Sequence, residues 1–193
     1  MNNKLKFEIK TKRLVIRPLV TTDYEAWKTA WDQIEEQLNE WDFHPDKYPI
    51  TSINEFKKIL SKQGQQLRAD EFYFFAVFLK KTGELIGSVS LMDVSRGIFQ
   101  NGYLGYYVFN PFWGNGYAFE ACKSLINFGF KKLNLHRIEA AINPRNRRSI
   151  MLARKLRLKK EGFSPRLLYR HGTWEDFTKY AATCEDFGIK WRE

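Results

Sequence analysis

The segment between Phe109 and Ala118 carries the clearest signal for ligand chemistry in this sequence. It reads Phe-Asn-Pro-Phe-Trp-Gly-Asn-Gly-Tyr-Ala and joins an expected strand to an expected amphipathic helix. Gly114 and Gly116 have no Cβ atom, so the backbone there can approach a ligand closely. The unpaired N–H groups of the following helical turn favour an anion. The pattern indicates a phosphate or pyrophosphate site or, alternatively, a tight helix entry that binds no ligand.

Two familiar phosphate-binding motifs are excluded by the residues around these glycines. A P-loop needs Gly-Lys-Ser or Gly-Lys-Thr, and this segment has neither. A dinucleotide-binding fingerprint needs a third glycine, and Phe119 stands in its place. The kind of phosphate ligand stays open at this point.

The composition fits one globular domain, spanning 1–193, with an anionic partner. The 193 residues include 32 Lys and Arg and 22 Asp and Glu, which gives a net charge of +10. Such a charge favours nucleic acid, an anionic membrane face or a phosphate-rich cofactor, while a solvated basic surface is the alternative. Eight basic and no acidic residues lie between Arg145 and Lys160, so an expected helix there could dock on ribosomal RNA.

Other chemistries have little support in the sequence. Cys122 and Cys184 are too few for a disulfide framework or a zinc site, and the histidines at 44, 136 and 171 are scattered, so no metal site is expected. No apolar run reaches the roughly 18 residues of a membrane span. The N-terminus lacks the apolar stretch of a secretory signal. We therefore expect a cytoplasmic protein that makes no membrane contact.

The elements that must position the glycine segment alternate between hairpins and helices. Capping-box patterns at 22–25 and 52–55 predict two helix starts, and a short helix with a loop is expected over 34–50. Alternating and apolar runs predict strands over 13–19, 72–80, 85–94, 102–109, 137–142, 163–170 and 174–183, and apolar stripes predict helices over 117–133 and 146–156. This order predicts an α/β fold with a sheet of mixed direction and about seven strands.

Several motifs, in a fixed order, resemble the GNAT N-acetyltransferases. Residues 113–118 look like that family's Arg/Gln-x-x-Gly-x-Gly/Ala motif, with Trp113 at the first position. Similarity to the RimJ/RimL-type branch, which acetylates the N-terminal residue of ribosomal proteins, extends to Thr11–Leu19, Leu104-Gly105-Tyr106-Tyr107, Asn143-Pro144-x-Asn146-x-x-Ser149 and Gly172-x-Trp174-x-Asp176. The resemblance covers nearly the whole chain.

The resemblance implies a GNAT fold, with a mostly antiparallel sheet flanked by helices, and acetyl-CoA as the co-substrate. In that fold the fourth strand, here 102–109, splays from the fifth, here 136–142, and pantetheine lies between them. Backbone groups of Val108 and Phe109 would pair with pantetheine. The other implied cofactor contacts are the N–H groups of Gly114, Asn115, Gly116, Tyr117 and Ala118 at the pyrophosphate, together with Asn143 and Asn146. For Asn146 the alternative is an ordinary helix N-cap.

Direct attack of an amine on the thioester, in a ternary complex, is the mechanism that the resemblance implies. The N–H of Val108 would stabilise the oxyanion, and Ser149 would protonate the leaving thiolate, with a capping serine as the alternative. Two residues depart from the family pattern. Tyr103 stands where many relatives have a glutamate base, and Ala153 stands where many have a tyrosine acid.

The acceptor amine has two interpretations. The leading one is the N-terminal alanine or serine of a ribosomal protein, because an α-amine with a pKa of about 7.7–8.0 is already partly neutral at pH 7 and needs only a weak base. The alternative is a polyamine, an aminoglycoside or an amino-acid-like metabolite, which the acidic residues at 32, 35, 36, 40, 42 and 46 would attract. A non-catalytic nucleic-acid module is a further alternative. The protein is expected to be a monomer or a homodimer.

Overall fold

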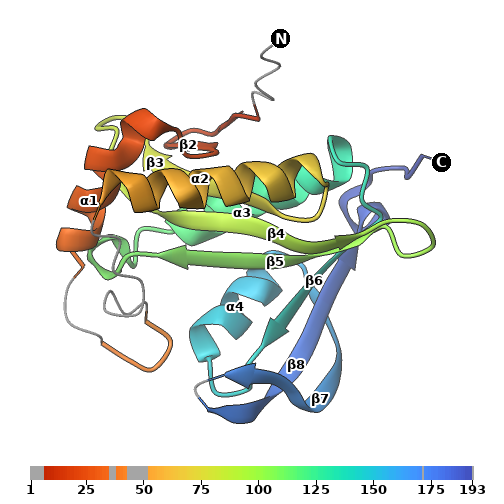
Figure 1. The fold of residues 1–193 in the computed structure, drawn as a ribbon. Coiled ribbons are helices and arrows are strands. Elements are labelled where there is room, and N and C mark those ends of the chain that lie inside the picture. The colour runs from red at the N-terminus through yellow and green to blue at the C-terminus, as the bar shows by residue number, and fades with distance from the viewer. Residues whose placement is uncertain (1–6, 35–37, 43–51, 171, 193) are drawn as a thin grey trace.

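The computed structural model describes residues 7–34, 38–42, 52–170 and 172–192, and its centre is one mixed sheet (Figure 1). The strands are β1 (Ile9–Lys10), β2 (Leu14–Arg17), β3 (Tyr73–Leu79), β4 (Leu85–Ser95), β5 (Asn101–Val108), β6 (Arg137–Ile142), β7 (Lys159–Arg170) and β8 (Thr173–Thr183). They lie in the order β1-β2-β3-β4-β5-β6-β8-β7, and only β5 and β6 run parallel. The predicted mixed, mostly antiparallel α/β sheet is confirmed. The sheet has eight strands because β1, with two residues, is too short to show a pattern.

Helices cover both faces of this sheet. They are α1 (Tyr24–Asp32), α2 (Ile53–Arg68), α3 (Tyr117–Lys131) and α4 (Arg147–Lys155), with 3-10 turns η1 (Thr21–Asp23), η3 (Asn110–Phe112) and η4 (Cys184–Phe187). The alternation of side chains along β3 builds both cores. Phe75 and Val77 pack in the core with α3 and α4, whereas Ala76 and Phe78 pack in the core with α1 and α2. Among the described helices, none has the length and apolar character needed to cross a membrane.

Of the two helix starts predicted from capping-box patterns, one has the expected N-cap and the other does not. Ser52 caps α2, since its hydroxyl accepts a hydrogen bond from the Glu55 N–H at 3.3 Å. The box predicted at 22–25 is wrong, because α1 begins at Tyr24 without a side-chain cap. Asp23 instead accepts two hydrogen bonds from the Arg17 guanidinium, a stronger charge-assisted partner. The helix and loop expected over 34–50 fall largely outside the described residues.

The parallel pair β5–β6 opens after a short contact. Residues Asn101–Tyr103 pair with Arg137–Glu139, and the pairing ends at Tyr103 and Glu139 although β5 continues to Val108. At the end of β5, the Phe109 N–H donates to the Ile86 carbonyl at 2.9 Å. The backbone N–H and C=O groups of successive residues point to opposite sides of a strand. Those of Val108 therefore point away from β4, towards the opening. The predicted splay between these two strands is confirmed.

Gly87 lets β4 approach β5 at this point. The register between β3 and β4 shifts beside it, and its φ is +155°. A Cβ atom at this position would lie 2.3 Å from the Tyr107 carbonyl oxygen and 2.8 Å from the Val108 Cα. Both obstacles are backbone atoms, so a side chain here must push β5 away from β4.

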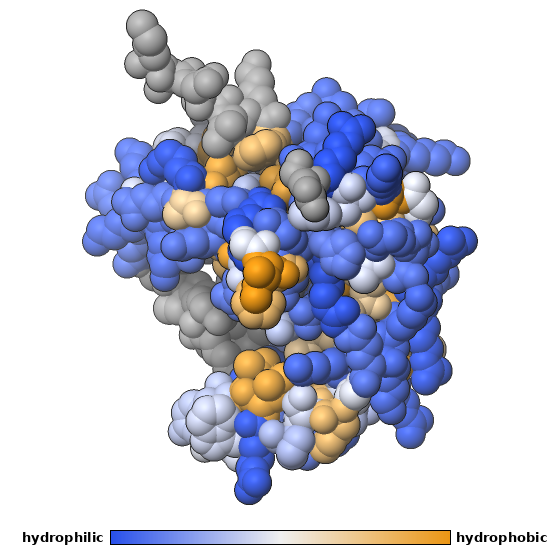
Figure 2. All heavy atoms as spheres, turned by 90° about the vertical axis from the view of Figure 1, so that its right-hand side faces the viewer, coloured by the Kyte–Doolittle hydropathy of each residue, from blue (hydrophilic) through white to orange (hydrophobic). Residues whose placement is uncertain are grey.

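The surface at the right of Figure 1 is largely hydrophilic. Figure 2 turns this side to the viewer and shows small hydrophobic patches separated by hydrophilic ones. The two most prominent exposed apolar residues of the β4–β5 connection are Ile98 and Phe99, which are 94% and 62% exposed. The connection therefore projects into solvent without contributing to either core.

We predict that Gly87→Ala lowers the free energy of unfolding by about 2–4 kcal/mol, because the new methyl group strains β4 and displaces β5. Urea unfolding followed by circular dichroism measures the loss. Gly162→Ala in β7 is the control, since no atom lies within 4 Å of its Cβ position. Equal stability of the two variants would show that the close β4–β5 contact does not exist.

Candidate active site

The glycine segment forms a left-handed turn that delivers the chain into α3. Gly114 and Gly116 have φ values of +77° and +75°, a region that favours glycine. Gly116 is the N-cap of α3, and no side chain caps the helix there. A Cβ atom at Gly114 would meet nothing within 4 Å, so the turn has open space beside it. The first N–H groups of α3 are thus suited to an anionic ligand.

Arg13 and Glu120 fasten this turn to the segment that leads into strand β2. Glu120, in the first turn of α3, accepts hydrogen bonds from the Thr11 hydroxyl at 2.6 Å, from the Arg13 N–H at 2.9 Å and from the Arg13 Nε at 2.7 Å. The Arg13 Nη1 donates to the Asn115 carbonyl at 2.9 Å. Burial raises the pKa of Glu120, but these hydrogen bonds outweigh it and hold the pKa below its usual value.

The guanidinium of Arg13 also contributes positive charge beside the turn. It lies over the Tyr117 ring at 4.5 Å, and its Nη2 would be 3.7 Å from a Cβ atom at Gly116. An open groove of about 440 Å³ adjoins it and is lined by Lys12, Arg13, Leu79, Lys80, Lys81, Thr82 and Tyr117. The sequence did not reveal Arg13 as a site residue, because its contact with Glu120 spans most of the chain.

Trp113 connects the turn with the end of β5 and with α4. Its indole N–H donates to the Val108 carbonyl at 2.6 Å, and the Arg148 guanidinium stacks over its ring at 4.6 Å. Of the two backbone positions expected at pantetheine, Phe109 already donates its N–H to Ile86 within the sheet. The Val108 N–H is therefore the amide of this pair that points towards the opening.

Ser149 lies in the first turn of α4, near a buried tyrosine. Its N–H donates to the Asn146 side-chain oxygen at 3.0 Å, so Asn146 is the N-cap of α4, as the alternative interpretation had it. The Tyr106 hydroxyl is buried next to Ser149, and burial raises the pKa of Tyr106. No pattern in the sequence distinguished Tyr106 from the other aromatic residues of β5.

Asn143 follows the end of β6 and is buried. Its side-chain oxygen accepts from the Arg145 N–H at 3.0 Å, and its amide donates to Glu175 at 3.2 Å. These bonds fix the turn between β6 and α4. The two asparagines thus both have structural roles in this turn.

Tyr103 and Glu139 occupy the closed end of the opening. Glu139 accepts a hydrogen bond from the Asn101 amide at 2.7 Å and pairs with Arg137 at 3.1 Å. Burial and the nearby charge of Glu139 raise the pKa of Tyr103. The phenol of Tyr103 therefore stays protonated at neutral pH and is unsuited to act as a base.

Comparison with known proteins identifies the ligand that this arrangement fits. A family model described as an acetyltransferase (GNAT) domain matches residues 13–159. The [ribosomal protein uS5]-alanine N-acetyltransferase of Escherichia coli K12 is 32% identical in an alignment that covers 96% of this chain and 95% of that protein.

Solved structures of acetyltransferases are also similar to this chain. The ribosomal-protein-S5-alanine acetyltransferase of Vibrio fischeri superposes with a TM-score of 0.72 at 25% identity, covering 96% of this chain and 99% of that one. Mycobacterium smegmatis RimJ, in complex with CoA-disulfide, superposes with a TM-score of 0.75 at 25% identity, covering 90% of this chain and 83% of that one. The uncapped start of α3, the open glycine turn and the splayed strands suit acetyl-CoA, the donor that this family uses. The chain belongs to the GNAT family of N-acetyltransferases.

Proposed function

We propose that this enzyme transfers the acetyl group of acetyl-CoA to the α-amine of an N-terminal alanine or serine, most simply that of a ribosomal protein. The observation that carries the proposal is the similarity to the uS5-alanine N-acetyltransferase of E. coli, which spans 96% of this chain and 95% of that protein. Because it extends over the elements on both faces of the sheet, it includes the acceptor side as well as the cofactor turn.

The proposed cofactor-binding site is built mainly from backbone groups. The pyrophosphate is held by the N–H groups of Gly114, Asn115, Gly116, Tyr117 and Ala118, and pantetheine passes Val108, Phe109, Asn143 and Asn146. The left-handed glycines and the uncapped start of α3 support this placement. Arg13 supports it further, because it neutralises Glu120 at the same helix end.

Acetyl transfer needs an oxyanion donor, an acid for the leaving sulfur and a base for the amine, and the chain offers the first two of these groups. The thioester of acetyl-CoA supplies the activated acetyl group. The N–H of Val108 stabilises negative charge on the carbonyl oxygen, and the hydroxyl of Ser149 gives a proton to the departing sulfur. A protonated Tyr103 leaves deprotonation of the amine to water, which suffices for an α-amine with a pKa of about 7.7–8.0.

A second candidate acceptor, a small polyamine, has one structural feature to recommend it. Acidic residues follow α1, and the described ones include Glu40 and Asp42. However, Glu40 pairs with Arg145 at 3.0 Å, and the buried Asp42 accepts from the Asn110 amide at 3.1 Å. These two carboxylates already have protein partners, which favours the α-amine acceptor.

Docking on ribosomes remains part of the proposal, with the basic helix α4 as the contact. Some of its charge is used within the protein, since Arg148 stacks on Trp113 and Lys155 lies over Phe119. The remaining basic residues of α4 are available to phosphate groups of RNA. Either a monomer or a homodimer is compatible with this arrangement.

The acceptor assignment is tested with purified enzyme, acetyl-CoA and three acceptors. These are a peptide that begins with alanine, the same peptide with a blocked N-terminus and an internal lysine, and spermidine. We expect kcat/KM for the free alanine peptide to exceed the other two by at least about tenfold. At low peptide concentration the rate should rise with pH and level off above about pH 8, because only the neutral amine attacks. A preference for spermidine would favour the small-amine alternative.

The Arg13–Glu120 pair is predicted to control cofactor affinity. Arg13→Gln should raise the KM for acetyl-CoA at least about tenfold with a smaller change in kcat, because Glu120 then repels the phosphates. Arg13→Lys should lie between wild type and Arg13→Gln, since lysine keeps the charge but not the forked donors. Adding Glu120→Gln to Arg13→Gln should recover part of the loss by removing the repelling charge.

Lys10→Gln is the matched control for Arg13, because Lys10 is an exposed basic residue that pairs with Glu8 at 2.9 Å. It should leave the KM unchanged. A folded Arg13→Gln enzyme with normal KM would contradict the role given to this pair.

Ser149→Ala is predicted to lower kcat at saturating substrate by at least about tenfold, because the thiolate then leaves without a proton donor. Steady-state kinetics measure the effect. Ser124→Ala is the control, since the Ser124 hydroxyl only donates to the Glu120 carbonyl within α3. If Ser149→Ala stays within about twofold of wild type, Ser149 is not the acid.

A further inference from the structure

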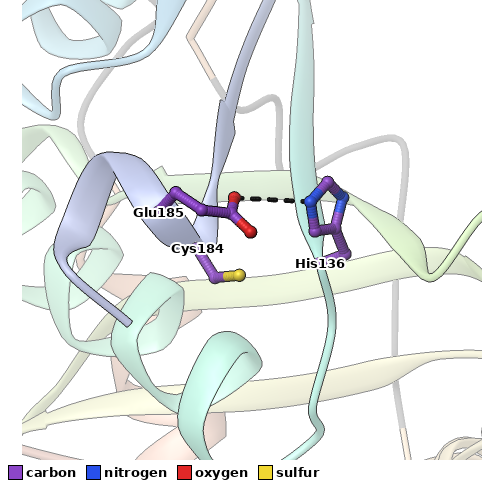
Figure 3. A group of neighbouring side chains, drawn as sticks. All are labelled: His136, Cys184 and Glu185. Atoms are coloured by element: carbon purple, nitrogen blue, oxygen red, sulfur yellow. Dashed lines mark ion pairs between the residues drawn. The ribbon is translucent and has the colours of Figure 1, made fainter. Parts of the chain in front are cut away.

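We infer that His136, Cys184 and Glu185 form a binding site for a zinc-class transition-metal ion, separate from the acetyl-transfer site. One nitrogen of His136, the sulfur of Cys184 and one carboxylate oxygen of Glu185 all lie within 4.8 Å of one another (Figure 3). The sequence suggested no metal site, because the three histidines are scattered along it. The structure instead places one histidine next to a cysteine and a glutamate.

The sheet itself brings the histidine and the cysteine together. Arg137 pairs with Thr183 across β6 and β8, so His136 and Cys184 are opposite each other one position further along. The Cys184 N–H donates to the His136 carbonyl at 2.9 Å, which continues the ladder. Residues opposite each other in an antiparallel pair have side chains on the same face. The arrangement of these two ligands is therefore fixed by the backbone.

The turn η4 supplies the third ligand. Glu185 follows Cys184 in this turn, and its Oε2 lies 3.3 Å from the His136 Nε2. The ring of Trp191 meets the His136 ring edge-on at 6.2 Å and limits its rotation. The residue just before β6 and the first two residues of η4 thus converge on one point.

The spacing fits tetrahedral coordination. With zinc–nitrogen and zinc–oxygen distances of about 2.0–2.1 Å and a zinc–sulfur distance of about 2.3 Å, neighbouring ligand atoms are separated by about 3.3–3.6 Å. The His136–Glu185 separation of 3.3 Å already has this value. The imidazole and the carboxylate need to approach the sulfur by little more than about 1 Å, which a rotation of the exposed His136 and Glu185 side chains can supply.

The chemistry and accessibility of the donors select the ion. Imidazole, thiolate and carboxylate together suit zinc and its neighbours, whereas calcium and magnesium prefer oxygen ligands alone. The side chains of His136 and Glu185 are 40% and 57% exposed, while Cys184 is buried. An ion can therefore enter from solvent past the first two residues, with the sulfur as the floor of the site. The thiol releases its proton to water when it binds, and a water molecule completes the fourth position.

The proposal is tested on the chelator-treated enzyme with zinc by calorimetry and with cobalt(II) by absorption. We expect one ion per chain and a near-ultraviolet charge-transfer band from cobalt bound to a thiolate. His136→Gln and Glu185→Gln, both at exposed side chains, should each weaken zinc binding by at least about tenfold. Cys184→Ala should abolish the thiolate band. Glu84→Gln, which removes an exposed carboxylate elsewhere, is the control and should change nothing.

Two results would overturn the proposal. One is the lack of stoichiometric zinc binding by the wild-type protein. The other is unchanged affinity in His136→Gln and Glu185→Gln, which would place the ion elsewhere. Because these two substitutions are on the surface, the test does not depend on whether Cys184→Ala folds. Acetyl transfer is not the readout, so the outcome is independent of the proposed acceptor.

Discussion

The short parallel contact between β5 and β6 is the constraint on which the rest of the site depends. A parallel pair needs a long crossover, and here α3 is that crossover, so its first turn follows soon after the end of β5. Because the registered pairing ends at Tyr103 and Glu139, the second half of β5 has backbone groups that face an opening. Such groups need a partner. A ligand in this opening meets the main chain of β5 and the start of α3 as one continuous surface.

Charge balance decides whether this helix end can hold an anion. A carboxylate in the first turn stabilises a helix, but a free one would compete with phosphate for the same N–H groups. In this protein Thr11 and Arg13 draw the carboxylate of Glu120 towards β2 and neutralise it. The helix keeps its stabilising residue without presenting the charge to a phosphate. The segment that leads into β2, distant in sequence from the turn, is therefore part of the proposed cofactor site.

Local sequence patterns predicted the elements of this fold, but they did not predict the contacts between residues that are distant in sequence. The strand at 137–142 and the glycine turn follow from alternation and from residue type, which neighbouring residues determine. The capping box wrongly predicted at 22–25 shows the limit of local patterns, because Asp23 accepts hydrogen bonds from Arg17, a residue of β2. The pairing of Arg13 with Glu120 and the meeting of His136 with Cys184 arise only once distant segments are packed together. A one-residue change of register between β6 and β8 would separate His136 from Cys184, and no local pattern fixes that register.

The pairing of the acidic side chains bears on which amine can be accepted. A polyamine carries several charges and needs carboxylates that are not already neutralised, because each buried ammonium must recover its lost hydration. Glu40 pairs with the Arg145 guanidinium at 3.0 Å, so its charge is already balanced, whereas Asp42 and Glu175 accept from the neutral Asn110 and Asn143 amides and keep their charge. An α-amine, by contrast, must lose its single charge before it attacks, so it needs no carboxylate to hold the ammonium form. Tyr103 and the ion-paired Glu40 are therefore the features that support the proposed α-amine acceptor.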